Sequence, residues 1–202
     1  MSAGAEYLWA TYTLANGSVI HVRPIQASDM ESLRAFHSRL SDATILFRYF
    51  GPMPMLTGDQ VRRLTHIDYD RRMALIATIG SGSGEQIVAI VRYEPMGPYR
   101  AEAAFVVEDR WQGMGIAKLL FHPLAAYARE RGFTTLVANI MTNNARMLHL
   151  LQHAGYPCTA LYESGCIELS LDISAPPAAH HGTYGGEMDH AVPGSEHTPH
   201  QG

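Results

Sequence analysis

Two glycines, Gly113 and Gly115, stand between an apolar run and a segment with helical periodicity, in the stretch EDRWQGMGIAKLL. The first N–H groups of a helix have no partner within the helix, and the helix dipole adds partial positive charge at that end. Glycine lets the backbone approach an anion closely and adopt a positive φ. The pattern therefore indicates a loop that binds a phosphate or pyrophosphate group.

The familiar nucleotide-binding loops do not fit this stretch. A Rossmann site needs a third small residue in G-x-G-x-x-G spacing, and Lys118 stands at that position. A P-loop needs Gly-Lys-Ser/Thr, which is absent. On the glycines alone, a plain tight turn into a helix stays open as an alternative. The two acidic residues ahead of the glycines, Glu108 and Asp109, are expected to have structural roles.

The second residue that could do chemistry is Glu102, which interrupts the apolar run A-E-A-A-F-V-V. A carboxylate in an apolar central strand is costly unless it is paired, solvated in a cleft or functional. In a cleft, it can accept a proton from an attacking group. The alternatives are a strand-end glutamate that faces water, or one paired with Arg92 or Arg100, and Glu94 is a second candidate for the base.

The remaining reactive side chains do not form a site that the sequence identifies. His149 and His153 lie four apart in HLLQH, but Leu150 occupies the place of the glutamate in the zinc motif H-E-x-x-H, so we expect no metal site. The cysteines, Cys158 and Cys166, are too few for a disulfide framework. They are interpreted as reduced thiols in a cytoplasmic protein.

The residues around the glycines resemble one family in particular. Gln112-x-x-Gly115-x-Ala117 fits the (Q/R)-x-x-G-x-(G/A) acyl-CoA signature of the GCN5-related N-acetyltransferases (GNAT), and VVEDRWQGMGIAKLL, LAAYARERGF, TLVANI and NNARMLHLLQHAGY follow in that family's order. The resemblance is detailed over 101–156. Upstream, HVRPIQASDMESLRAFHSRLSDATILFRYF is similar to the start of the acetyltransferase domain of bacterial Pat-type protein lysine acetyltransferases.

The resemblance implies acetyl-CoA as the acyl donor. It places the pyrophosphate on the backbone amides at the start of the helix and the pantetheine arm beside the strand that ends at Val107. Asn144 matches the family's asparagine near the thioester, although a role as helix N-cap would also explain an asparagine there. The cofactor-binding residues expected on this basis are Phe105, Val106, Val107, Gln112, Gly113, Met114, Gly115, Ile116, Ala117 and Asn144.

The resemblance also implies direct transfer of the acetyl group to a primary amine. Glu102 has the position of the catalytic glutamate of Pat-like enzymes, so it is expected to deprotonate the amine. The expected acceptor is a protein lysine, for example on an acyl-CoA synthetase; a small amine, or a non-catalytic acyl-CoA-sensing module, stays open. Many relatives protonate the leaving thiolate with a tyrosine four residues before a terminal glycine, and here that position is Leu151.

The elements that must position these residues follow from periodicity and turn signals. Their order predicts an α/β fold with a mixed sheet and helices on both faces. The GNAT resemblance adds that the sheet is mostly antiparallel and splays between the family's strands 4 and 5, here 101–107 and 135–140. The expected elements are a hairpin of 7–14 and 18–23, a helix from a Ser28/Glu31 capping box to Leu40, a helix N-terminus at Thr57/Gln60, strands 73–79, 86–93, 101–107 and 135–140, helices 115–131 and 144–154, and a final hairpin within 157–173.

Composition sets the outer limits of this hypothesis. The 202 residues, 47% of them apolar, are expected to form one domain over 1–173 and a disordered tail, rich in Gly, Pro and His, over 174–202. A formal charge of −4 argues against a general nucleic-acid binder. The N-terminus lacks the pattern of a signal peptide, and no apolar run is long enough for a membrane span. We therefore expect neither nucleic acid nor membrane as a partner.

Overall fold

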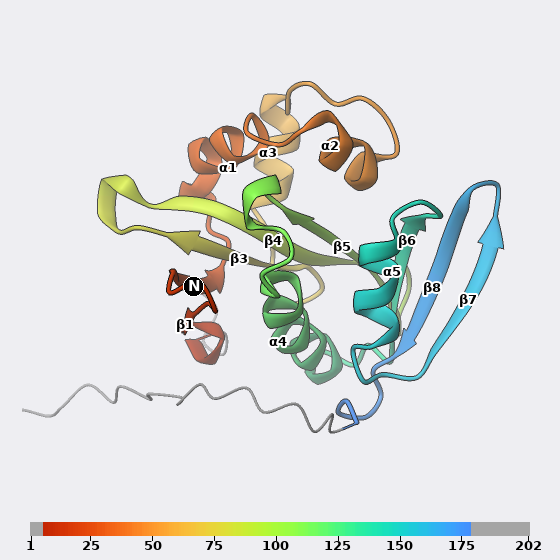
Figure 1. The fold of residues 1–202 in the computed structure, drawn as a ribbon. Helices are drawn as coiled ribbons and strands as arrows, with labels where there is room; N and C mark the ends of the chain where they lie inside the picture. Colours follow the sequence, from red (N-terminus) through yellow and green to blue (C-terminus); the bar gives the residue numbers. More distant parts are fainter. Residues whose placement is uncertain (1–5, 179–202) are drawn as a thin grey trace, which may run out of the picture.

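The computed structural model describes residues 6–178, which form an open eight-stranded sheet in the order β1-β2-β3-β4-β5-β6-β8-β7 (Figure 1). Every neighbouring pair is antiparallel except β5 and β6, which are parallel. The strands are β1 (Ala10–Thr13), β2 (Val19–Pro24), β3 (Met73–Ile79), β4 (Gln86–Pro95), β5 (Arg100–Val107), β6 (Thr135–Met141), β7 (Cys158–Glu163) and β8 (Cys166–Asp172). The predicted mixed, mostly antiparallel sheet is confirmed.

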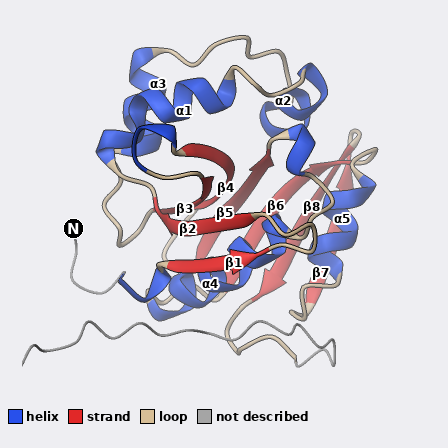
Figure 2. Cartoon of the chain, turned by 60° about the vertical axis from the view of Figure 1, so that its left-hand side comes forward, coloured by secondary structure: helices blue, strands red, loops and turns tan. Residues whose placement is uncertain are grey.

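Helices cover both faces of this sheet, as predicted (Figures 1 and 2). On one face, α1 contacts β4 and α2 contacts β5. On the other face, α4 packs across β3, β4 and β5, and Tyr156, which follows α5, packs against Phe121 of α4. Because both faces are covered, β3 and β4 are buried along nearly their whole length. The helices are α1 (Met30–His37), α2 (Asp42–Tyr49), α3 (Gly58–Thr65), α4 (Ile116–Glu130) and α5 (Ala145–Gln152).

The parallel pair β5–β6 is short, so most of each strand is not paired with the other. The two strands pair only over Arg100–Glu102 and Thr135–Val137, although β5 continues to Val107 and β6 to Met141. Beyond Glu102 and Val137 the strands diverge, while β6 stays paired with β8 along its whole length. The splay expected from the resemblance is therefore present, with Glu102 at its fork.

Local signals predicted some helix starts correctly and others not. The capping box at Thr57 is confirmed, since Gln60 N–H donates to Thr57 Oγ1 at 3.2 Å and Thr57 N–H donates to Gln60 Oε1 at 2.7 Å. The box predicted at Ser28 and Glu31 is wrong. Asp29 is the carboxylate that caps this turn, and it accepts from the backbone N–H of Gln26 at 2.7 Å.

The ends of the described chain lie close to expectation. The hairpin around Asn16-Gly17 is confirmed, with Gly17 at φ +80°. After β8 the chain packs back on the loop that follows α5, and Ala178 N–H donates to the carbonyl of Gly155 at 2.8 Å. The rest of the predicted tail, 179–202, lies outside the described residues.

Candidate functional site

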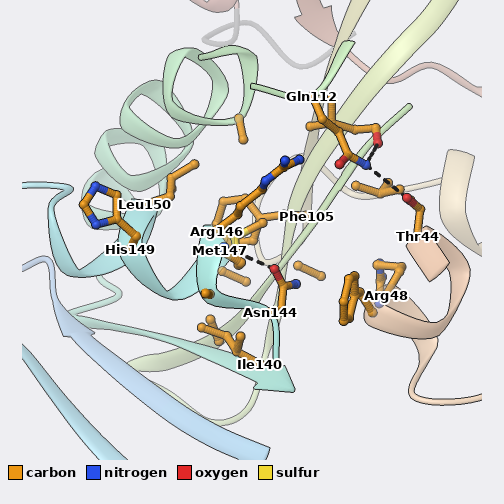
Figure 3. A pocket seen from close by; sticks show the side chains of 18 of the residues that line it. Thr44, Arg48, Phe105, Gln112, Ile140, Asn144, Arg146, Met147, His149 and Leu150 are labelled. Atoms are coloured by element: carbon orange, nitrogen blue, oxygen red, sulfur yellow. Dashed lines mark hydrogen bonds between the residues drawn. The ribbon is translucent and has the colours of Figure 1, made fainter. Parts of the chain in front are cut away.

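A cleft of about 710 Å³ occupies the splay between β5 and β6. It is lined by residues of both strands, by the loop and first turn of α4, by α5, and by α2 from the opposite side (Figure 3). The segments that meet here are far apart in the sequence. The cleft therefore joins the two features that the sequence singled out, the glycine loop and Glu102.

The edge of β5 that faces the cleft is free for pairing. Glu108 N–H donates to Val88 C=O at 2.9 Å on the β4 side. Because hydrogen-bonded and non-hydrogen-bonded pairs alternate in an antiparallel ladder, the backbone groups of Phe105 and Val107 point the other way, toward β6. On the edge that faces β6, no described strand pairs with β5 beyond Glu102. Phe105 and Val107 thus offer N–H groups to an extended ligand in the splay.

The glycine loop supplies a second set of donors. Gly113 has φ +78° and Gly115, the N-cap of α4, has φ +80°, values that L side chains rarely adopt. A Cβ at either position would meet no atom within 4 Å, so the backbone conformation and not the space requires glycine. Within the described chain, no hydrogen bond engages the N–H groups from Gly113 to Ala117. They form a cradle for an anion at the start of the helix.

Gln112 differs from the expectation. Its backbone N–H donates to Asp109 C=O at 3.2 Å, so the row of free N–H groups begins one residue later than predicted. Its side-chain amide donates to Thr44 Oγ1 at 3.0 Å and to Val107 C=O at 3.1 Å (Figure 3). Gln112 therefore ties the loop to the end of β5 and to α2.

The acidic pair ahead of the loop has the structural role that the sequence suggested. Buried Glu108 pairs with Arg39 Nε at 3.0 Å and with Arg110 Nε at 2.6 Å. Asp109 accepts from Ser41 N–H at 2.9 Å, from Ser41 Oγ at 2.5 Å and from Thr44 Oγ1 at 2.8 Å. Partial burial would raise the pKa of Asp109, but these hydrogen bonds outweigh it and hold the pKa below its usual value.

Glu102 lies in the cleft, and no basic side chain within 6–178 forms an ion pair with it. Both arginines proposed as its ion-pair partner bind elsewhere, Arg92 at Glu94 and Arg100 at Glu168. The paired interpretation is therefore wrong. The side chain is exposed, and Glu102 Oε1 accepts from Asn139 Nδ2 of β6 at 3.2 Å, across the fork of the two strands.

Glu94, the second candidate, is directly opposite Glu102 in the β4–β5 register but is fully engaged. Its carboxylate is 3.2 Å from Arg63 Nη2 and 3.1 Å from Arg72 Nη2, with hydrogen bonds to both. Arg92 Nη2 is also 3.1 Å away, without hydrogen-bond geometry, so we assign it a Coulombic role only. Burial opposes ionisation, yet the arginines lower the pKa of Glu94. A carboxylate held in this way is a poor proton acceptor.

Asn144 and Leu151 define the start and the core side of α5. Asn144 is the N-cap, since its Oδ1 accepts from Met147 N–H at 3.2 Å, and it also lines the cleft, so both interpretations of this residue agree with its position. Leu151 is fully buried and does not line the cleft. His149 and His153 lie side by side with ring centroids 4.1 Å apart, and no group of three metal-ligating side chains converges anywhere within 6–178.

No helix was expected over Asp42–Tyr49, yet α2 presents Thr44, Phe47 and Arg48 to the cleft. The signal was available, because Ser41 Oγ accepts from Thr44 N–H as an ordinary N-cap. Asn139, the partner of Glu102, had no signal in the sequence.

The comparisons with known proteins agree with this geometry. The family described as "Acetyltransferase (GNAT) family" matches residues 45–156, more than half of the chain. The chain belongs to the GNAT family. This GNAT chain is 30% identical over 145 residues to Acetyltransferase PA5475 of Pseudomonas aeruginosa, covering 71% of this chain and 78% of that protein.

Two Pat proteins are also similar to this GNAT chain. The GNAT domain of S. lividans PAT superposes with a TM-score of 0.76 at 35% identity, over 83% of this chain and 98% of that one. Acetyltransferase Pat of Mycolicibacterium smegmatis is 27% identical over 69% of this chain, but the match spans only 41% of that protein.

The protein is therefore an acetyltransferase that takes its acetyl group from acetyl-CoA, the donor used by GNAT enzymes. The residues present fit that donor. The N–H groups of 113–117 can bind its pyrophosphate, and the open edge of β5 can pair with the amides of its pantetheine arm. No described helix combines the length and apolarity needed to cross a bilayer.

Proposed function

We propose that this GNAT enzyme acetylates a lysine side chain of a protein, with Glu102 as general base. The observation that carries the proposal is the free carboxylate of Glu102 at the fork of the splay. Its cross-strand neighbour Glu94 is held by Arg63 of α3, so Glu102 lies on the sheet face that α1, α2 and α3 cover. Phe105, which packs on Phe121 of α4 with centroids 5.5 Å apart, faces the other way. A donor bound at the start of α4 would thus reach the fork from the face of α4, and the acceptor would reach it from the face of α1, α2 and α3.

The proposed chemistry needs a neutral amine. Deprotonating a lysine of pKa about 10.4 at pH 7 costs roughly 4.6 kcal/mol. The donor supplies a thioester carbonyl that the amine attacks. Glu102 accepts the amine proton, directly or through one water, while Asn139 holds the carboxylate in place. A backbone N–H on the open edge of β5, that of Val107 or of its neighbour Phe105, would donate to the carbonyl oxygen as it gains negative charge.

A protein lysine as acceptor is supported by the similarity to the Pat proteins and by the wall of α2. Phe47 and Phe50 line the cleft there, and their apolar surfaces suit the methylene chain of a lysine. We place the reaction in the cytoplasm, because Cys158 and Cys166 are both free thiols. An acyl-CoA synthetase is one candidate partner.

A non-catalytic acyl-CoA sensor is the second candidate function. It is favoured by Leu151, since the position at which many relatives carry a thiolate-protonating tyrosine is apolar and buried here. In the catalytic proposal, water protonates the thiolate or CoA leaves as the thiolate.

The test is release of free thiol from acetyl-CoA in the presence of lysine peptides, polyamines, a purified acyl-CoA synthetase and a dialysed cell extract, followed by mapping of acetylated lysines. The proposal predicts acetyl-CoA-dependent acetylation of protein lysines. Turnover with small amines alone would show that the acceptor is a small amine and not a protein lysine. Saturable acetyl-CoA binding with no turnover on any acceptor would favour the sensor.

A further inference from the structure

In the proposed function, the cleft has a donor half, formed by the N–H groups of 113–117 and the open edge of β5, and an acceptor half, formed by Glu102, Asn139 and the side chains of α2. Two hydroxyl side chains at the start of α2 connect these two halves. Thr44 Oγ1 donates to Asp109 Oδ1 at 2.8 Å and accepts from Gln112 Nε2 at 3.0 Å. Ser41, the N-cap of α2, also binds Asp109 through its N–H and its hydroxyl. The Thr44 hydroxyl therefore bridges two residues of the loop that leads into the anion cradle.

This bridge is buried and specific. Thr44 is 7% exposed, so its hydroxyl would destabilise the folded state if it had no hydrogen-bond partner. The Gln112 amide that reaches Thr44 also binds Val107 C=O, at the end of the strand whose edge faces the splay. Loop, strand end and helix start are thus held by one continuous set of hydrogen bonds.

The same helix forms one wall of the acceptor half. Phe47 and Arg48 of α2 line the cleft one turn beyond Thr44, and Figure 3 shows Arg48 beside it. The Arg48 guanidinium lies 5.0 Å from the centroid of the Tyr49 ring, a cation–π contact that favours this direction. Any shift of the N-terminus of α2 would therefore move this wall.

Building on the proposed function, we propose that Thr44 is a positioning residue that couples donor binding to the acceptor wall. An anion bound at 113–117 immobilises the loop, and the loop fixes α2 through Asp109, Thr44 and Gln112. Occupancy of the donor half then orders the acceptor half before the amine arrives. Coupling between sites in proteins typically corresponds to a change of 5- to 150-fold in affinity.

The experiment is amide hydrogen exchange with and without saturating acetyl-CoA, which needs no acceptor. In the wild type, acetyl-CoA should slow exchange both at 112–117 and in α2, the latter by roughly 5-fold or more. Thr44→Val removes the hydroxyl at constant size, so slowing at 112–117 should persist while the acetyl-CoA-dependent slowing in α2 is lost. Thr44→Ser should restore it.

Controls separate coupling from folding. Thr65→Val removes a buried hydroxyl whose hydrogen bonds within the described chain go to α3 and to His66, and it should behave as the wild type. Asp109→Asn disrupts the bridge from the loop side and replaces Thr44→Val should that variant not fold. Equal slowing of α2 in wild type and variant would overturn the coupling, as would slowing confined to 112–117 in the wild type. No change anywhere would overturn the donor site itself.

Discussion

The donor half and the acceptor half of the cleft are built by different means. We assign the donor half to backbone groups, namely the N–H groups of 113–117 and the open edge of β5. We assign the acceptor half to side chains from segments distant in sequence, with Phe47 and Arg48 on α2, Glu102 on β5 and Asn139 on β6. Backbone donors at a helix start suit any molecule that carries the same pyrophosphate, whereas side chains can be changed for each acceptor.

This difference explains why the donor is shared across the GNAT family while the acceptor must be determined for each member. A backbone cradle depends on two positive-φ glycines and tolerates variation at other positions. The acceptor wall depends on which helix packs at the mouth of the splay. Substitutions in the two halves should therefore separate donor affinity from turnover.

The largest expected effect is on turnover, in Glu102→Gln. Loss of the base should lower kcat by roughly 10²- to 10⁴-fold, because that is the usual contribution of general acid–base catalysis. Acetyl-CoA affinity should not change, since no N–H of the cradle is altered. Steady-state kinetics and calorimetric titration with acetyl-CoA measure the two quantities.

Glu94→Gln is the matched control, because Glu94 lies opposite Glu102 in the register. It should leave kcat within about threefold but lower the free energy of unfolding by about 1–3 kcal/mol, since three arginines lose their counter-charge. A larger loss of turnover in Glu94→Gln than in Glu102→Gln would show that the base is Glu94 on β4 and not Glu102 on β5.

A smaller effect is expected in the donor half, in Gly115→Ala. An L residue at φ +80° is strained by about 1–2 kcal/mol. A loop that relaxes out of this conformation must regain it to bind, so acetyl-CoA affinity should fall roughly 5- to 30-fold. The kcat at saturating acetyl-CoA should change little.

Gly132→Ala provides the same strain away from the cleft. Gly132 has φ +84°, and an added Cβ there also meets nothing within 4 Å. This variant should lose a similar free energy of unfolding yet keep its acetyl-CoA affinity. If both variants weaken acetyl-CoA binding equally, the cradle has no special need for Gly115.

The smallest expected effect is on the pH dependence of the free energy of unfolding, through His37 next to α2. His37 is buried beneath α2, with its ring centroid 5.8 Å from that of Tyr49, and burial lowers the pKa of its imidazole. The folded state therefore binds the proton less well than the unfolded chain, whose pKa is about 6.5. Stability from neutral His37 is present above that pH and is lost as pH falls below it.

Urea unfolding between pH 8 and 5 tests this pH dependence. The free energy of unfolding of the wild type should fall more steeply below about pH 6.5 than that of His37→Leu, by a slope of less than one proton. Parallel curves for the two proteins would show that His37 does not titrate in this range.

Several elements show how far local sequence determines this fold. The hairpin at Asn16-Gly17 and the capping box at Thr57 were predicted correctly, because their contacts lie within a few residues. The capping box at Ser28 failed because tertiary structure chose Asp29, whose carboxylate forms hydrogen bonds of 2.8 Å to both Nη atoms of Arg23. Propensity cannot anticipate such a buried ion pair.

The sequence by itself determined the glycine loop that we assign to the donor. Glycines at the start of a helix force the positive φ values and leave N–H groups free, and both consequences are local. Only the tertiary structure decided the acceptor half. The β4–β5 register puts Glu94 opposite Glu102, and the arginines reach Glu94 from α3 and from β4, leaving Glu102 without an ion pair among the described residues. Which carboxylate stays free is set by contacts between residues 31 positions apart (Arg63 and Glu94) and 68 positions apart (Arg100 and Glu168), and no local pattern encodes them.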